Sequence, residues 1–182
     1  MKKMLTLLLL VVFAAAEAQI QTPAASPAAS VSTTVGLTDV KINYARPKMK
    51  GRKIFGEGGD FLVPYGQLWR TGANAGTVIT FSDDVTVGDK SLKKGDYLLL
   101  TIPGASEGAV ILYSDPSMGG NTAAYDQSKD AVRLTAKSAK LADRVETFTV
   151  NITDISDDNT KANIEVAWEN TSVKFGITLD YD

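Results

Sequence analysis

The stretch from Val63 to Ile102 decides the fold and reads VPYGQLWRTGANAGTVITFSDDVTVGDKSLKKGDYLLLTI. In its second half Ile79 and Phe81 flank Thr80, and the stretch ends in the apolar run 97–102. A period of two is typical of a half-buried β-strand, and a short apolar run is typical of a central strand covered on both faces. Turn residues at 88–89 and 94–96 separate these segments. We therefore expect a β-sheet core with 97–102 near its centre.

The rest of the chain repeats this pattern. Apolar residues recur at every second position in five more segments: 40–44, 132–136, 148–152, 162–168 and 173–179. Polar turns at 156–159 and at Asn170-Thr171 predict that the last three segments are separate strands of an antiparallel meander. A helix is conceivable only as one short turn within 137–144. About eight or nine short strands without a long helix predict an all-β, antiparallel β-sandwich, with a flattened barrel as the second choice.

The N-terminus has the build of a secretory signal peptide. Lys2 and Lys3 precede an apolar run of residues 4–16, and Ala16-Glu17-Ala18 follows as a small-residue cleavage site. The run is shorter than the roughly 20 residues that a membrane-spanning helix needs. We therefore expect cleavage after Ala18 and export to the periplasm or the outside of the cell, with no transmembrane segment after cleavage.

The segment after the signal peptide, residues 19–32, is rich in Ala, Pro and Ser. It holds too few large apolar residues to offset the entropy of ordering it, so a flexible tether is expected. A single domain from 33 to 182 follows, and nothing in the sequence specifies an oligomeric state.

Composition excludes several chemistries. The chain of 182 residues contains no His and no Cys, so Ser-His-Asp and Cys-His catalysis, zinc sites of the usual kind and disulfides are all excluded. Its formal net charge of −2 does not favour a nucleic-acid partner. We expect no cofactor and no metal. An enzyme would have to use carboxylate, lysine or tyrosine chemistry.

Two acidic groups and one long loop are further candidate sites. Asp83-Asp84 and Asp154 with Asp157-Asp158 lie at expected turns, where Asp is favoured for local backbone hydrogen bonds, and neither group has the ligand spacing of a calcium loop. Solvated turns are the favoured interpretation. The loop 114–130 is interpreted as a surface excursion in preference to a binding element.

One cluster differs in kind, because it combines aromatic and basic side chains near glycines. Such a mixture can stack on a sugar ring or hold a carboxylate with a guanidinium group. In the alternative, the aromatic residues cap the core, Arg70 pairs with a carboxylate and Asn74 closes a turn. The candidate ligand-binding residues are Arg46, Lys53, Tyr65, Trp69, Arg70 and Asn74, with Arg52 beside them.

Several separated motifs of the chain resemble one family in the same order. These are Arg46-Pro47, the stretches 50–56, 62–66 and 69–74, and Lys94-Gly95-Asp96-Tyr97 through Thr101-Ile102-Pro103. Together they resemble the DUF2911 family of exported bacterial proteins, common in Bacteroidetes, over about residues 40–175. The resemblance implies export and draws attention to the turn 69–74, but it implies no activity. Relative to the family pattern, Ala75-Gly76 replaces an acidic residue and Ala109 replaces a common tryptophan.

Three functions remain open from the sequence. The leading hypothesis is an exported, non-enzymatic β-sandwich that binds a glycan or peptide through the aromatic and basic cluster. The second is a hydrolase that uses carboxylates such as Glu57, Asp83 or Asp84 without histidine. The third is a structural module of the cell envelope.

Overall fold

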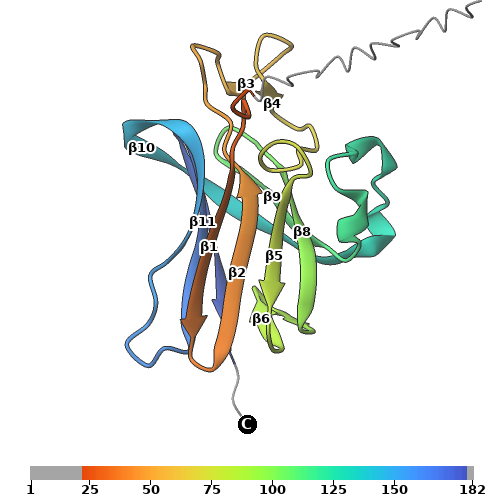
Figure 1. Ribbon diagram of the computed structural model, residues 1–182, viewed down its shortest axis with the longest axis vertical. Coiled ribbons are helices and arrows are strands. Elements are labelled where there is room, and N and C mark those ends of the chain that lie inside the picture. Colours follow the sequence, from red (N-terminus) through yellow and green to blue (C-terminus); the bar gives the residue numbers. More distant parts are fainter. Residues whose placement is uncertain (1–21, 180–182) are drawn as a thin grey trace, which may run out of the picture.

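A computed structural model describes residues 22–179, and these residues form mainly β-structure (Figure 1), which confirms the expected all-β class. The expected signal peptide, residues 1–18, and residues 19–21 lie outside the described part. The strands are β1 (Ala28–Val35), β2 (Thr38–Ala45), β3 (Phe55–Gly56), β4 (Val63–Pro64), β5 (Thr77–Phe81), β6 (Val85–Val87), β7 (Lys90–Leu92), β8 (Gly95–Ile102), β9 (Glu107–Tyr113), β10 (Asp130–Thr153) and β11 (Lys161–Thr178). Three short 3-10 helices lie between β9 and β10: η1 (Pro116–Met118), η2 (Thr122–Ala124) and η3 (Gln127–Lys129).

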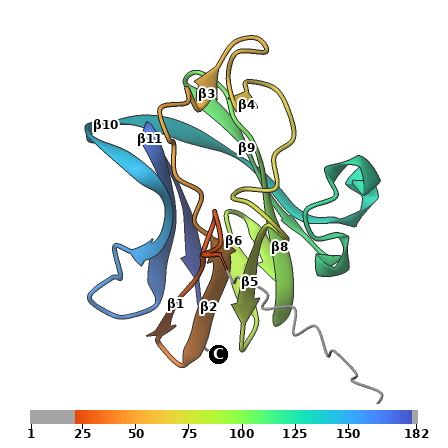
Figure 2. The same ribbon diagram turned by 45° about the horizontal axis from the view of Figure 1, so that its top comes forward.

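Nine strands form one antiparallel sheet in the order β1-β2-β5-β8-β9-β10-β11-β6-β7. The long strand β10 belongs to two layers, because its first residues pair with β9 and its later residues pair with β11. The sheet therefore folds over at β10 into a sandwich-like arrangement, visible in Figures 1 and 2. Within 22–179 the strands do not close into a barrel. The short parallel pair β3 and β4 lies at one end, at the top of Figure 1.

The main core lies between the two layers. Alternate residues of the strands face inward, as the period of two predicts: Ile79 and Phe81 of β5 are buried, whereas Val78 and Thr80 are only half-buried. The layer of β10 and β11 contributes Phe148, which is also buried. The sequence therefore predicts which face of these strands is buried.

A second, smaller core lies on the outer face of β8 and β9. It consists of Leu98, Leu100, Ile111 and Tyr113, all fully or almost fully buried. Met118 and Tyr125 from the segment 114–129 pack against it. The expectation that 97–102 is covered on both faces is confirmed, and the covering element on the outer face is the long loop.

Tyr125 fixes this loop to β10. Its hydroxyl donates to Asp130 at 2.9 Å and accepts from the Arg133 guanidinium, while Arg133 Nε is 2.8 Å from the same carboxylate. Burial and the bond to Asp130 raise the pKa of the Tyr125 phenol. The segment 114–129 therefore has a packing role on the outer face of the sheet.

The predicted tether, residues 19–32, extends too far toward the C-terminus, because a strand begins at Ala28. Residues 28–32 belong to β1 and pair with β2, with Ala28 opposite Ala45. β1 is an edge strand whose residues 28–34 are half-buried or exposed, so it needs few large apolar side chains. Its backbone hydrogen bonds to β2 hold it in place.

One possibility and one expectation for the C-terminal third are not met. Residues 137–144, the one segment that could hold a short turn of helix, are part of β10, where the register with β11 shifts between Lys140 and Val145. Asn170-Thr171, expected to be a turn, lies inside the continuous strand β11. Glu169 there has a φ of 55°, and the buried side chains change from even positions such as Trp168 to odd positions such as Phe175. A bulge shifts the period in this way without reversing the chain.

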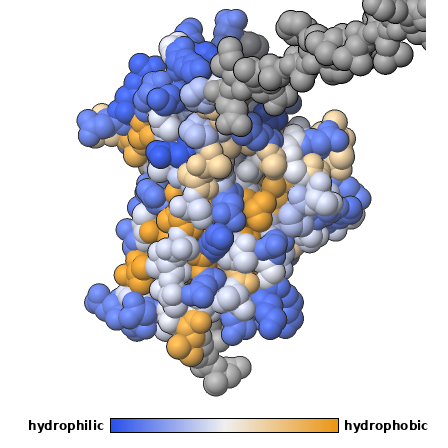
Figure 3. All heavy atoms as spheres, in the orientation of Figure 1, coloured by the Kyte–Doolittle hydropathy of each residue, from blue (hydrophilic) through white to orange (hydrophobic). Residues whose placement is uncertain are grey.

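The outer surface is polar at the end that holds β3 and β4. Figure 3 shows hydrophilic residues gathered there, whereas apolar residues form separate patches between polar ones over the face of β1, β2 and β5. Among the described residues the large exposed apolar side chains are Leu37, Leu62 and Ile155. No described helix is long and apolar enough to cross a membrane.

The second core should contribute to stability as much per buried side chain as the main core between the two layers. We expect Leu100→Ala to lower the free energy of unfolding by about 2–5 kcal/mol, because truncating a fully buried leucine leaves a cavity. Leu37→Ala, at a side chain that is 81% exposed, should change it by less than about 0.5 kcal/mol. Urea unfolding followed by tryptophan fluorescence measures both. Equal, small effects would contradict the packing role of the segment 114–129.

Candidate functional site

The loop 69–76, between β4 and β5, is held rigidly against β8. Trp69 and Thr101 exchange two backbone hydrogen bonds of 2.8 and 3.0 Å. The buried Thr71 hydroxyl is 3.1 Å from the Thr101 hydroxyl, and Thr77 Oγ1 donates to the Thr71 carbonyl. Because these contacts are buried, the loop has a defined shape.

Gly72 in this loop is required by its backbone and by its surroundings. Its φ is +123°, a value that side chains rarely adopt. A Cβ there would also lie 3.2 Å from Thr77 Oγ1 and 3.4 Å from the Phe148 ring. The chain turns tightly here between the two layers.

Trp69 is the centre of an aromatic cluster that joins the loop to the second layer. Its ring stacks on Trp168 of β11 at 5.9 Å between centroids and 17° between planes. It also meets Phe55 at 5.8 Å and Phe148 at 5.4 Å, both edge to face. Each aromatic pair stabilises by about 0.5–1.5 kcal/mol beyond the burial of its area. Trp69 is therefore mainly a packing residue, and the Trp168 ring covers part of one of its faces.

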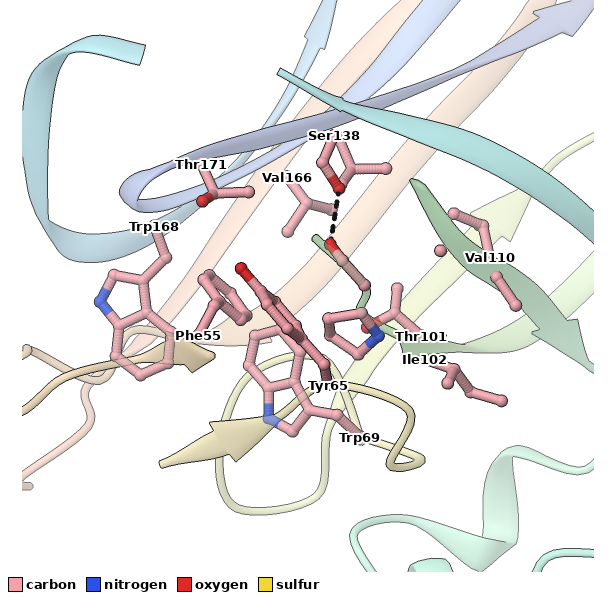
Figure 4. Close-up of a pocket in the computed structure, with 15 residues that line it drawn as sticks. Phe55, Tyr65, Trp69, Thr101, Ile102, Val110, Ser138, Val166, Trp168 and Thr171 are labelled. Carbon is pink, nitrogen blue, oxygen red and sulfur yellow. Dashed lines mark hydrogen bonds between the residues drawn. The ribbon is translucent and has the colours of Figure 1, made fainter. Parts of the chain in front are cut away.

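A small apolar cavity lies on one side of this cluster, between the two layers. Its volume is about 40 Å³. Figure 4 shows Phe55, Tyr65, Trp69 and Trp168 gathered around it, with the Ser138 hydroxyl donating to the Gly104 carbonyl at 3.3 Å. Ala109 lines it as well. A cavity of this size can take a group no larger than a few carbon atoms.

A larger cleft is also lined by Trp69 and Trp168. Its volume is about 380 Å³. It is lined by Ser26, Pro47, Arg52, Leu62, Val63, Trp69, Arg70, Gly72, Ala73, Asn74 and Trp168. Two of these residues are cationic and none is acidic. The cleft is therefore an electropositive hollow bordered by apolar and aromatic groups.

Arg70 is the most informative residue of the cleft. Its Nη1 donates to the Gly120 carbonyl at a long 3.5 Å, and its Nε is buried with no hydrogen-bond partner. Within residues 22–179 no aspartate or glutamate forms an ion pair with Arg70. Arg70 therefore brings to the cleft lining a positive charge that no described carboxylate neutralises.

The model of the family described as "Protein of unknown function (DUF2911)" matches residues 26–177. The chain belongs to the DUF2911 family. No curated protein and no solved structure shows a significant match. The recognition made from the motifs is confirmed, and the family adds no activity to the geometry.

The structure of this DUF2911 chain separates the predicted site residues. Arg70, Asn74 and Trp69 line the cleft, whereas Tyr65, with Trp69, lines the apolar cavity. Asn74 Nδ2 donates to the Ser26 carbonyl at 3.3 Å, which links the loop to the segment before β1.

The other basic residues of the predicted cluster have different surroundings. Lys53 lies 5.6 Å over the Phe61 ring, and Arg46 lines neither of these two hollows, although its Nε is buried without a partner. Arg52 does line the cleft, but it donates to the carbonyls of Lys48 and Met49 at 2.7 and 2.9 Å. Arg52 therefore contributes charge more than free donors.

Some cleft residues are not apparent from the sequence. Leu62 and Trp168 line the cleft although neither is near a polar motif, and Ser26 lies in the segment expected to be a tether. The sequence predicts Trp168 only as one residue of a strand with alternating burial, and no sequence pattern predicts its contact with Trp69. Of the two departures from the family pattern, Ala75-Gly76 does not line the cleft, and Ala109 lines the apolar cavity.

The acidic turns make local contacts. Asp84 is 2.7 Å from Lys93 Nζ, and Asp154 is 2.8 Å from Lys174 Nζ, which lowers the pKa of both carboxyls. Hydrogen bonds from the Ser156 hydroxyl and then from Thr160 lower the pKa of Asp158 to about 2. Within 22–179 no group of three or more acidic side chains could hold a metal ion. These contacts agree with the interpretation as turns.

The different surroundings of Trp69 and Arg70 can be tested by stability. We expect Trp69→Ala to lower the free energy of unfolding by about 3 kcal/mol, because it removes the stack on Trp168 and two edge contacts. Arg70→Gln should lower it by less than about 1 kcal/mol, because its one hydrogen bond is long. Guanidinium unfolding measures both. A loss of folding in both variants would contradict a ligand-binding role for Arg70.

Proposed function

We propose that this protein is an exported, non-enzymatic binding module whose cleft beside Trp69 holds an anionic group of its ligand. The single observation behind the proposal is Arg70: a cationic side chain at a cleft of about 380 Å³, with no carboxylate paired to it and none in the lining. A guanidinium group in such a position matches a ligand carboxylate, which can accept two parallel hydrogen bonds. An acidic glycan and a peptide can both supply that group.

The same lining supports binding over hydrolysis. A hydrolase without histidine would need carboxylates at the substrate, and no aspartate or glutamate lines the cleft. Asp84, one of the candidates for such a role, is paired with Lys93 at a turn. The alternative of a purely structural envelope module gives no reason for an unpaired guanidinium in the lining of a cleft that has no acidic residue.

Two probes test the binding proposal: a galacturonic acid trisaccharide and a tripeptide with a free terminal carboxylate. Calorimetry should show saturable binding of at least one, weakened about tenfold or more by Arg70→Gln, because a hydrogen bond to a charged group contributes about 1.5–3 kcal/mol. A higher salt concentration should also weaken the binding of the probe.

Lys90→Gln is the matched control for this loss of charge, because Lys90 is exposed on the edge strand β7. This variant should bind as the parent does. Equal loss in Lys90→Gln and Arg70→Gln, or no saturable binding of either probe at millimolar concentration, would contradict the proposal.

Export is proposed from residues 1–18 alone. When the full gene product is made in a Gram-negative bacterium, we expect the mature protein in the periplasmic or extracellular fraction, with Gln19 as its first residue. N-terminal sequencing measures this. A Leu8→Arg variant, which interrupts the apolar run, should stay in the cytoplasm at full length. Recovery of unprocessed parent protein in the cytoplasm would refute export.

A further inference from the structure

The polar groups of the cleft differ in kind from those a sugar requires. Its free charged donors come from Arg70, because Arg52 already donates to two backbone carbonyls and the Asn74 amide to a third. The side-chain acceptors are only the Asn74 carbonyl and the Ser26 hydroxyl. Sugar hydroxyls must donate as well as accept when they are desolvated, so a glycan would leave several of them unpaired. A carboxylate only accepts, and it matches this set.

The backbone of the loop adds further donors. The N–H groups of Gly72, Ala73 and Asn74 have no acceptor within residues 22–179, and all three residues line the cleft. The φ angle is +123° at Gly72 and +55° at Asn74 but is not positive at Ala73. Successive residues of alternating handedness form the concave backbone that binds anions in many proteins.

The remaining part of the cleft is apolar. Leu62 is 44% exposed and is one of the few large apolar side chains at the described surface. It lines the cleft with Val63, Pro47 and Trp69. An exposed leucine beside an anion site suits a ligand that has an apolar group close to its carboxylate.

We propose that the cleft binds the free C-terminus of a peptide whose last residue is apolar. The terminal carboxylate accepts from Arg70 and from the N–H groups of 72–74, and the last side chain packs on Leu62 and Trp69. Backbone capture of a terminal carboxylate is an established mode of peptide recognition. This inference rests on the proposed function, since it names the ligand of the same cleft.

The test compares two fluorescein-labelled peptides, Ser-Gly-Ser-Gly-Ala-Leu with a free C-terminus and the same sequence ending in an amide. Fluorescence anisotropy with the full mature chain should show at least tenfold tighter binding of the free acid. Arg70→Gln should abolish that difference, and Arg70→Lys should keep part of it, because the charge remains while the paired donors are lost. A purely structural role for Arg70 would weaken both peptides alike.

The apolar contact has its own control. Leu62→Ser should weaken the peptide that ends in leucine several-fold and leave a peptide ending in alanine unchanged, and Leu37→Ser should change neither. Near-ultraviolet circular dichroism verifies that each variant is folded.

Three results would overturn the inference. They are equal binding of acid and amide, an acid preference that persists in Arg70→Gln, and no binding of either peptide. If the galacturonic acid trisaccharide then binds in an Arg70-dependent way, the anion site stands and the peptide inference fails. If neither class of probe binds, both proposals fail.

Discussion

The stack of Trp69 on Trp168 is the contact on which the upper end of the molecule depends. Trp69 comes from a loop bonded to β8 in one layer, and Trp168 comes from β11 in the other, so their contact joins the layers. A backbone bridge between Lys48 and Thr147 of β10 joins them as well. Phe55 and Phe148 complete the cluster from two further segments. The two tryptophans line both the apolar cavity and the cleft, so the aromatic cluster and the candidate site share the same side chains.

The fold could be predicted from the sequence wherever the period of two is regular. It could not be predicted where the period is interrupted, because a bulge and a turn give the same interruption. The change of phase after Trp168 suggested a turn at Asn170-Thr171, whereas Glu169 with φ 55° keeps the chain running as one strand. Likewise Lys137 to Arg144 contains good helix formers, but pairing with β9 and β11 overrides that local preference. Propensity is a weak guide where a strand crosses between layers.

The candidate site could be predicted only in part. The loop 69–76 was apparent because aromatic, basic and glycine residues adjoin in sequence, and its Arg70 and Asn74 do line the cleft. Arg46 and Lys53 are near in sequence but lie away from it, because sequence proximity gives no direction to a side chain. Trp168 is the reverse case, being distant in sequence yet in contact with Trp69. Such long-range contacts arise from the folding over of the sheet at β10.

We propose that the cleft beside Arg70 binds a carboxylate with an apolar neighbour. Nuclear magnetic resonance with ¹⁵N-labelled protein tests it most directly, using benzoate as the probe and benzamide as its uncharged match. We expect saturable shifts of the N–H signals of Gly72, Ala73 and Asn74 and of Arg70 Nε–H with benzoate but not with benzamide. Equal shifts with both compounds, or shifts confined to exposed lysines such as Lys90, would contradict it.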